Sequence, residues 1–210
     1  MADRTVTLFH TPQTRSTGVL TLLEELGAPY RLELLNQTKE EHLAPAYRAI
    51  NPMGKVPALR DAAGGIVTEQ VAIFLHLADL FPEAGLAPSL GDPLRGPYLR
   101  WMVFYAASFE PAVVDRALAR EPGKRAMSPY GDFDTVIDTV TAALAKGPFL
   151  LGERVSAADI LWGTALGWTT GFKLVPERPE IMAYVRRIAD RPAVKRAQEK
   201  DTALAAAQKA

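Results

Sequence analysis

A strand–helix–strand pattern at the start of the chain restricts the fold more than any other feature of the sequence. Polar and apolar side chains alternate over residues 5–8 and again over residues 30–34, which is the period-two signature of strands. Between these segments, apolar residues recur at helical spacing over residues 19–26, and Gly27 offers a stop for the helix. The chain is therefore expected to begin with a layer of sheet and helix.

Two further strands and a helix complete this first region. The sequence indicates a strand over residues 57–60, a turn at residues 63–65, a strand at residues 66–67 and a helix over about residues 69–81. The first domain, residues 1–82, is therefore predicted to be a small α/β unit.

The pattern changes after the first domain, because the strand-like alternation stops. A loop rich in proline and glycine follows, and we place the domain linker at residues 83–92 within it. Apolar residues then recur at helical spacing over residues 98–109 and 133–144. The second domain, residues 93–210, is predicted to be all-helical.

Helix-boundary motifs support this prediction. Ser156 and Asp159 have capping-box spacing directly before an apolar run, with Asp in place of the usual Glu or Gln. Pro179 and Pro192 suit the first turns of helices, and residues 203–210 are expected to form a fraying helix or a loose tail. We assign the capping pair a structural role, so its loss should impair folding rather than chemistry.

The charge balance argues against polyanionic partners. The chain has 24 basic and 24 acidic side chains and a formal net charge of +0, so no overall field attracts nucleic acid or an acidic membrane. The first residues lack the apolar segment of a signal peptide, and the apolar run at residues 101–109 is shorter than the roughly 20 residues of a spanning helix. We expect a cytoplasmic protein that binds neither nucleic acid nor membranes.

Missing motifs narrow the chemistry. The chain has no cysteine, which removes disulfides, thiolate metal sites and a cysteine nucleophile. His10, His42 and His76 share no metal-ligand spacing, and the sequence has no phosphate-binding P-loop, no G-x-G-x-x-G and no G-x-S-x-G. No metal is expected, and sulfur chemistry would need a ligand that brings the sulfur.

Four segments stand in a recognisable order and spacing: INPMGKVPAL (residues 50–59), TEQVAIFLHLAD (68–79), VSAADI (155–160) and RPAVKRA (191–197). Together they resemble the cytosolic glutathione transferase family over essentially the whole chain, with features of bacterial theta- and beta-like members. The resemblance implies a thioredoxin-like first domain that binds glutathione and an all-helical domain that lines the pocket for an electrophile.

The same resemblance implies roles for the residues around the second pair of strands. The Val56–Pro57 bond should be cis, so that the Val56 backbone pairs with the cysteinyl unit of glutathione as an added strand would. Glu69 and Gln70 should hold the γ-glutamyl end, although Gln70 stands where the family most often has Ser. The alternative is that Glu69 only compensates the helix dipole, with Thr68 as the N-cap.

Other expected contacts are less specific. By resemblance, His42 lies near the glycyl carboxylate and Lys55 is the lysine before the cis-proline dipeptide, which puts a cation near each end of the peptide dianion. Without the resemblance, His42 is a surface helix residue and Lys55 a solvated loop lysine. Tyr105, Phe109 and Trp168 are the expected electrophile-pocket residues, although aromatic residues at helical spacing are more often part of a core.

The stretch HTPQTRSTGVL, residues 10–20, places hydroxyls and a guanidinium at the start of the first helix, where a helix N-terminus favours an anion. If that anion is the glutathione thiolate, the hydroxyl candidates are Thr11, Thr14 and Ser16. We favour Ser16 as the activating group, with Thr14 second and Arg15 as a source of positive charge. Ser16 could also be a plain N-cap.

The function that the resemblance implies is a detoxifying glutathione S-transferase, a homodimer that conjugates the glutathione thiolate to small hydrophobic electrophiles. Glutathione is then the co-substrate. One alternative is other glutathione-dependent chemistry at the same site, such as peroxide reduction, isomerisation, ring opening or dehalogenation. Another is a binding or scaffold protein that has lost catalysis.

Overall fold

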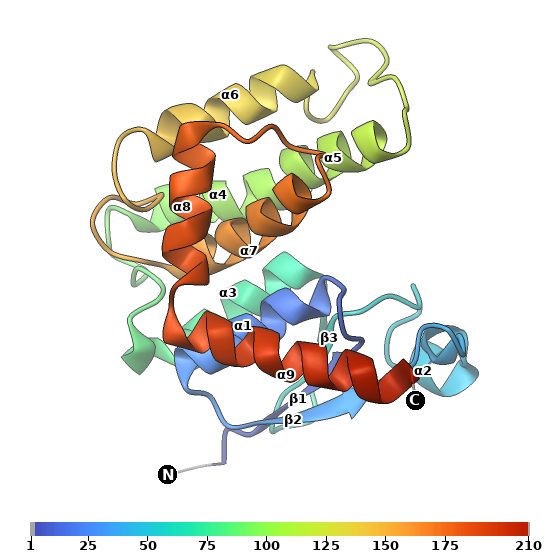
Figure 1. Ribbon diagram of the computed structural model, residues 1–210. Coiled ribbons are helices and arrows are strands. Elements are labelled where there is room, and N and C mark those ends of the chain that lie inside the picture. Colours follow the sequence, from blue (N-terminus) through green and yellow to red (C-terminus); the bar gives the residue numbers. More distant parts are fainter. Residues whose placement is uncertain (1–2, 210) are drawn as a thin grey trace. The chain divides into compact units, whose positions relative to one another are not determined.

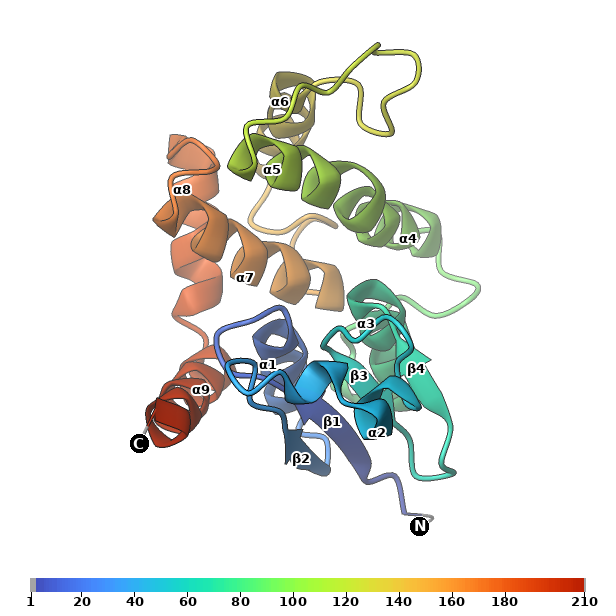
Figure 2. The same cartoon turned by 90° about the vertical axis from the view of Figure 1, so that its right-hand side faces the viewer.

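The computed structural model describes residues 3–209, and these residues form two compact units (Figure 1, Figure 2). Unit 1 is made of the chain up to Ala84 together with the chain from Arg191 onward, and unit 2 is Gly85–Asp190. The expected first domain thus corresponds to most of unit 1. The C-terminal segment, which we expected in the helical domain, belongs to unit 1 instead.

Unit 1 contains a four-stranded mixed sheet. Its elements in chain order are β1 (Val6–His10), α1 (Ser16–Leu26), β2 (Tyr30–Leu34), the short 3-10 helix η1 (Glu41–Leu43), α2 (Pro45–Arg48), β3 (Ala58–Arg60), β4 (Ile66–Thr68), α3 (Gln70–Leu80), the 3-10 helix η2 (Pro82–Ala84) and α9 (Pro192–Lys209). The strand order is β2-β1-β3-β4, in which β1 is parallel to β2 and antiparallel to β3. This is the predicted thioredoxin-like fold.

The side chains of β1, one of the two inner strands, show how each face of the sheet is covered. Val6 and Leu8 are fully buried on one face, and α1 and α3 pack beside each other and against the sheet. Phe9 points to the other face, because side chains alternate along a strand, and its ring lies 5.7 Å from that of Tyr47 in α2. α1 ends where the sequence predicts, since Gly27 adopts the left-handed conformation at the C-cap with φ +60°.

The last helix, α9, packs along α1 (Figure 1). Arg191 makes two hydrogen bonds of 2.7 Å to the carboxylate of Glu25, and Lys200 donates to Glu24 at 2.8 Å. The alanine-rich end is helical up to Lys209, rather than loose, and Ala205 is buried; Ala210 lies outside the described residues. These polar contacts depend on pairings across the fold, which the local pattern of the sequence does not reveal.

Unit 2 is all-helical, as predicted. Its elements are α4 (Arg95–Phe104), the π-helical turn η3 (Tyr105–Phe109), α5 (Glu110–Ala117), α6 (Phe133–Leu144), α7 (Ala157–Gly171) and α8 (Pro179–Ala189). The fully buried Trp162 is central to its core and donates from its indole Nε1 to the backbone oxygen of Trp101 at 3.0 Å. No helix within residues 3–209 is both long enough and apolar enough to cross a membrane.

Candidate functional site

The start of α1 has the features of an anion site. Arg15 occupies the N-cap position without a side-chain capping bond, and the first turn contains no acidic residue. The positive end of the helix dipole is therefore not compensated by a side chain of α1 itself. Ser16 is the first residue of the helix and not its N-cap, so the plain capping role that we considered for it is wrong.

The hydroxyl of Ser16 is enclosed by the turn before α1. The side chain is fully buried, and its Oγ donates to the backbone oxygen of Thr11 at 2.9 Å and accepts from the Thr11 N–H at 3.1 Å. His10 Nδ1 and Thr14 Oγ1 each lie 2.8 Å from the same oxygen. A ligand atom has no room to reach this hydroxyl, which argues against our preference for Ser16 over Thr14.

Thr14 is the better-placed hydroxyl of the turn. Its side chain is half-buried, and its Oγ1 donates to the backbone oxygen of Thr11 at 2.7 Å while lying next to Ser16. Arg15 is exposed. Thr14 therefore combines partial exposure with a link to the buried hydroxyl behind it.

The loop before β3 presents an unpaired stretch of backbone. The Val56–Pro57 bond is cis, as the resemblance implies. The preceding residue, Lys55, is held by its backbone oxygen, which accepts from Tyr47 Oη at 2.6 Å and Asn51 Nδ2 at 2.7 Å. Within residues 3–209, neither the N–H nor the C=O of Val56 has a hydrogen-bond partner. Both groups are available to an extended ligand.

Glu69 is strained at the start of α3. It has φ +67° and ψ 120°, a conformation that costs a residue with a side chain about 1–3 kcal/mol. Its exposed carboxylate makes no capping bond, and in the described part of the chain it has no hydrogen-bond or ion-pair partner. Glu69 is itself the N-cap residue, so the alternative with Thr68 as the cap does not hold.

Gln70 connects the starts of the two helices of unit 1. Its side-chain amide donates to the backbone oxygen of Arg15 at 3.1 Å. A Cβ at Gly18 would lie only 2.7 Å from Gln70 Nε2, so the missing side chain at Gly18 makes room for this contact. The amide that replaces the usual Ser therefore reaches the start of α1 and the turn before it, residues 11–15.

The two residues expected near carboxylates of the ligand are His42, in η1, and Lys55, in the loop directly before the cis peptide bond. His42 is half-buried in η1, and its Nδ1 is enclosed without a hydrogen-bond partner among residues 3–209. Lys55 is exposed. Neither position contradicts a contact with a carboxylate.

The three aromatic residues expected in the electrophile pocket do not form one group in unit 2. Tyr105 and Phe109 are buried, and their ring centroids lie 5.5 and 4.8 Å from that of Trp162. Trp168 is 44% exposed and stacks edge-on with Phe172, which is 62% exposed. Tyr105 and Phe109 therefore act as core residues of unit 2, and Trp168 is the one with an accessible ring.

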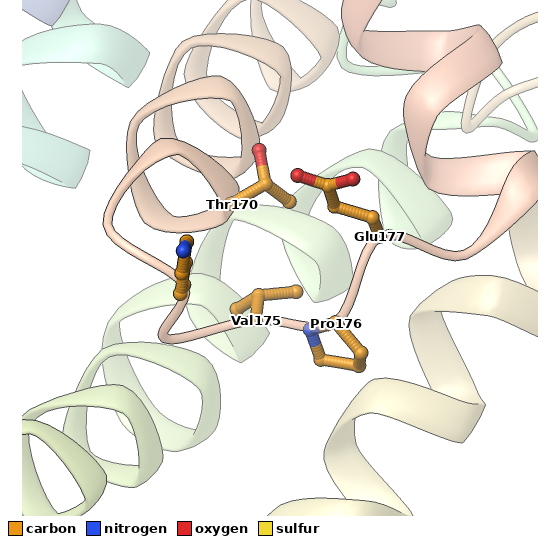
Figure 3. Close-up of a pocket in the computed structure, with 5 residues that line it drawn as sticks. Thr170, Val175, Pro176 and Glu177 are labelled. Carbon is orange, nitrogen blue, oxygen red and sulfur yellow. The ribbon is translucent and has the colours of Figure 1, made fainter.

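A shallow depression in unit 2 gathers none of these residues (Figure 3). It has a volume of about 330 Å³ and is lined by Thr170, Lys173, Val175, Pro176 and Glu177. The Thr170 hydroxyl donates to the backbone oxygen of Leu166 at 2.7 Å, which is an ordinary intrahelical contact. The depression offers no group that is prepared for catalysis.

Sequence reasoning missed two side chains that lie next to the turn before α1. His10 is fully buried behind it, and Asp201 of α9 accepts from the N–H of Gln13 at 3.0 Å. The sequence carries no local signal for this contact, because the two residues are 188 positions apart.

Comparison with known proteins gives a consistent result across the chain. The sequence matches the glutathione S-transferase N-terminal domain over residues 4–79 and the glutathione S-transferase C-terminal domain over residues 111–187. It is 29% identical over 189 residues to glutathione S-transferase GstA of Escherichia coli O157:H7, covering 89% of this chain and 94% of that protein. It is 26% identical over 201 residues to the disulfide-bond oxidoreductase YfcG of Escherichia coli K12, covering 90% and 92%.

This chain is also similar to a solved structure in three dimensions. The glutathione S-transferase of a sphingomonad, complexed with glutathione, superposes with a TM-score of 0.79 at 30% sequence identity, covering 93% of this chain and 98% of that one. Both domain matches fall in the order in which the structure places the sheet and the helices. The chain belongs to the glutathione S-transferase family.

Proposed function

We propose that this protein is a glutathione S-transferase that binds glutathione on unit 1, ionises its thiol and directs the thiolate at an electrophilic carbon of a small hydrophobic molecule. The observation that carries the proposal is the convergence at the start of α1. A helix N-terminus with no acidic residue in its own first turn, the half-buried Thr14 hydroxyl and the Gln70 amide all lie there.

The chemical task of this site is to form a thiolate. A thiol with a pKa near 8.5 is only a few per cent ionised at pH 7, so a site must favour the anion by hydrogen bonding or positive charge. In our proposal Thr14 donates to the sulfur and the α1 dipole stabilises the negative charge. Exposed Arg15 adds a positive charge nearby, and Ser16 supports Thr14 from behind.

The rest of the tripeptide has matching groups on unit 1. The unpaired backbone of Val56, next to cis Pro57, pairs with the cysteinyl unit. The free carboxylate of Glu69 meets the ligand ammonium, and the start of α3 at Gln70 meets the γ-glutamyl carboxylate.

We assign the other two contacts by charge and exposure. His42 offers a ring nitrogen to the glycyl carboxylate, and exposed Lys55 attracts a carboxylate of the tripeptide by its positive charge. Of the three aromatic candidates, Trp168 is proposed for the electrophile because its ring is accessible, whereas Tyr105 and Phe109 are buried around Trp162 in the core of unit 2. A role in detoxification would follow from such an electrophile, and the likeness to the cytosolic members of the family favours a cytoplasmic location.

A second candidate is glutathione-dependent reduction of a disulfide or peroxide. The relative YfcG is named a disulfide-bond oxidoreductase, and this chain has no cysteine of its own. The same activated glutathione sulfur would therefore have to attack the oxidised substrate. Turnover of a panel that contains chlorinated aromatics, peroxides and glutathione disulfides distinguishes the two candidates, and retention on immobilised glutathione without any turnover would indicate a binding protein.

Replacing Thr14 with Val should raise the pKa of bound glutathione by about 1–2 units, because a hydrogen bond to a charged group contributes about 1.5–3 kcal/mol. The measurement is an ultraviolet titration of the thiolate absorbance. Thr14→Ser keeps the hydroxyl and should stay near wild type. A Thr14→Val protein with an unchanged thiol pKa would move activation to Arg15, which the Arg15→Ala variant tests.

The protein should be a homodimer. The resemblance implies that the first domain of one subunit packs on the helical domain of the other, and Val103 on α4 is 57% exposed. Light scattering at micromolar concentration should give twice the mass of a single chain. A monomer at that concentration would contradict this prediction.

A further inference from the structure

A buried chain of polar side chains connects α9 to the turn before α1. His10 Nδ1 lies 2.8 Å from Ser16 Oγ, and His10 Nε2 lies 3.1 Å from Asp201 Oδ1. His10 and Ser16 are fully buried, and Asp201 is 5% exposed. Burying three polar side chains costs free energy unless each is paired, so their alignment behind the turn before α1 calls for an explanation.

Asp201 holds the inner end of this series of polar side chains. Its Oδ1 accepts from Thr17 Oγ1 at 2.7 Å, and its Oδ2 accepts from the N–H of Gln13, a residue held at φ +58°. Burial alone would raise the pKa of Asp201, but hydrogen bonds from His10, Thr17 and Gln13 outweigh it and hold the pKa below its usual range. The carboxylate is therefore charged where it faces the ring, and the other side chains that α1 places here, Ser16 and Thr17, are uncharged.

The carboxylate fixes which ring nitrogen of His10 carries the proton. The approach of Nε2 is close but not in line with an ideal N–H···O bond, so charge contributes to the contact alongside hydrogen bonding. With a proton on Nε2 facing Asp201, the neutral ring presents Nδ1 as an acceptor to the Ser16 hydroxyl. In the Ser-His-Asp triad of serine proteases, a carboxylate likewise orients a histidine toward a hydroxyl.

The hydroxyls of Ser16 and Thr14 extend this series of polar side chains toward the surface. Ser16 Oγ and Thr14 Oγ1 are 2.8 Å apart, and Thr14 is half-buried. In the absence of ligand the Ser16 and Thr14 hydroxyls can both donate to the backbone oxygen of Thr11. When they rotate to donate to His10 Nδ1 and to Ser16 Oγ instead, Thr14 Oγ1 can accept from a thiol. Every donor in this sequence faces an acceptor.

We infer that His10, held by Asp201, receives the thiol proton of glutathione through Thr14 and Ser16. The inference rests on the proposed function. The S–H bond of glutathione breaks as its proton passes to Thr14 Oγ1, the Thr14 proton passes to Ser16 Oγ, and the Ser16 proton forms an N–H bond at His10 Nδ1. The products are a thiolate that accepts from Thr14 and an imidazolium paired with Asp201, with the same heavy-atom contacts as before.

The direct test uses the wild-type protein with ¹⁵N-labelled histidine, assigned with His42→Gln and His76→Gln variants. Without ligand, His10 should be protonated at Nε2 and bare at Nδ1. Saturating glutathione should protonate Nδ1, whereas S-methylglutathione, which has no thiol proton, should not. A thiolate absorbance with Nδ1 still bare would overturn the relay but leave the proposed function standing. Failure of calorimetry to detect either ligand would overturn both.

Variants supply an independent readout. Asp201→Asn should raise the pKa of the bound thiol by about one unit, a tenfold loss of thiolate at a given pH below that pKa, and shift the acidic limb of the kcat/KM profile to higher pH by the same amount. The matched control is Arg191→Gln, which removes a different contact between α1 and the C-terminal segment, at Glu25 near the far end of α1 from the turn. This control should lower Tm without moving the thiol pKa. Equal thiol pKa values in both variants and wild type would overturn the relay.

Discussion

Replacing Asp159 with Ala is expected to lower the free energy of unfolding by about 3 kcal/mol or more, with a fall in Tm of roughly 6–12 °C. The fully buried carboxylate accepts four hydrogen bonds: two from Ser156, one from the N–H of Leu150 and one from Tyr184 Oη, all between 2.8 and 2.9 Å. Truncation would leave the Leu150 N–H without an acceptor and the buried Tyr184 hydroxyl with only the backbone oxygen of residue 159, at 3.3 Å, and it would remove the side chain that caps the Ser156 N–H. Calorimetric or denaturant unfolding measures the loss.

A second N-cap in unit 2 provides the control. Asp132 is the N-cap of α6 and accepts from the N–H of Thr135 at 2.7 Å, but its side chain is 34% exposed, whereas Asp159 is fully buried. Asp132→Ala should therefore destabilise much less than Asp159→Ala. In both variants the pKa of the bound glutathione thiol should match wild type in the folded fraction. If the two variants lose equal stability, the hydrogen bonds to Leu150 and Tyr184 are not the source of the effect.

Local chemistry explains why much of the fold was predictable. Val6 and Leu8 alternate with threonines because one face of β1 is fully buried, and the pair Ser156 and Asp159 announces a helix start because its two side chains cap each other's backbone. These signals act over a few residues. The place of α9 was not predictable in the same way, because it packs on α1 through contacts such as Arg191 with Glu25.

The candidate site also has features that the sequence predicts and one that it does not. The cis bond before Pro57 and the position of Glu69 at a helix start follow from motifs that the sequence displays. The choice between Thr14 and Ser16 does not, since both are small hydroxyl residues in one turn. What separates them is His10, which encloses Ser16 from the end of β1, and a sequence does not show which hydroxyl a distant ring will cover.

Replacing Glu69 with Ala should weaken glutathione binding by about 1.5–3 kcal/mol, a loss of roughly 10- to 150-fold in affinity, because it removes a charged hydrogen-bonding partner of the ligand ammonium. The effect should appear mainly in KM for glutathione and in the calorimetric Kd. Glu83→Ala removes an equal charge from unit 1, where that residue pairs with Arg4, and should leave the affinity unchanged.

A glycine at the same position separates binding from strain. Glu69→Ala keeps a side chain at φ +67°, so it should not become more stable, whereas Glu69→Gly removes the clash and should gain about 1 kcal/mol in unfolding free energy. Both variants lose the carboxylate, so both should bind glutathione equally weakly. Such a result would mean that the strain at Glu69 is kept because it holds the carboxylate where the ligand needs it. A Glu69→Ala protein with wild-type affinity and lower stability would instead assign Glu69 to the helix dipole alone.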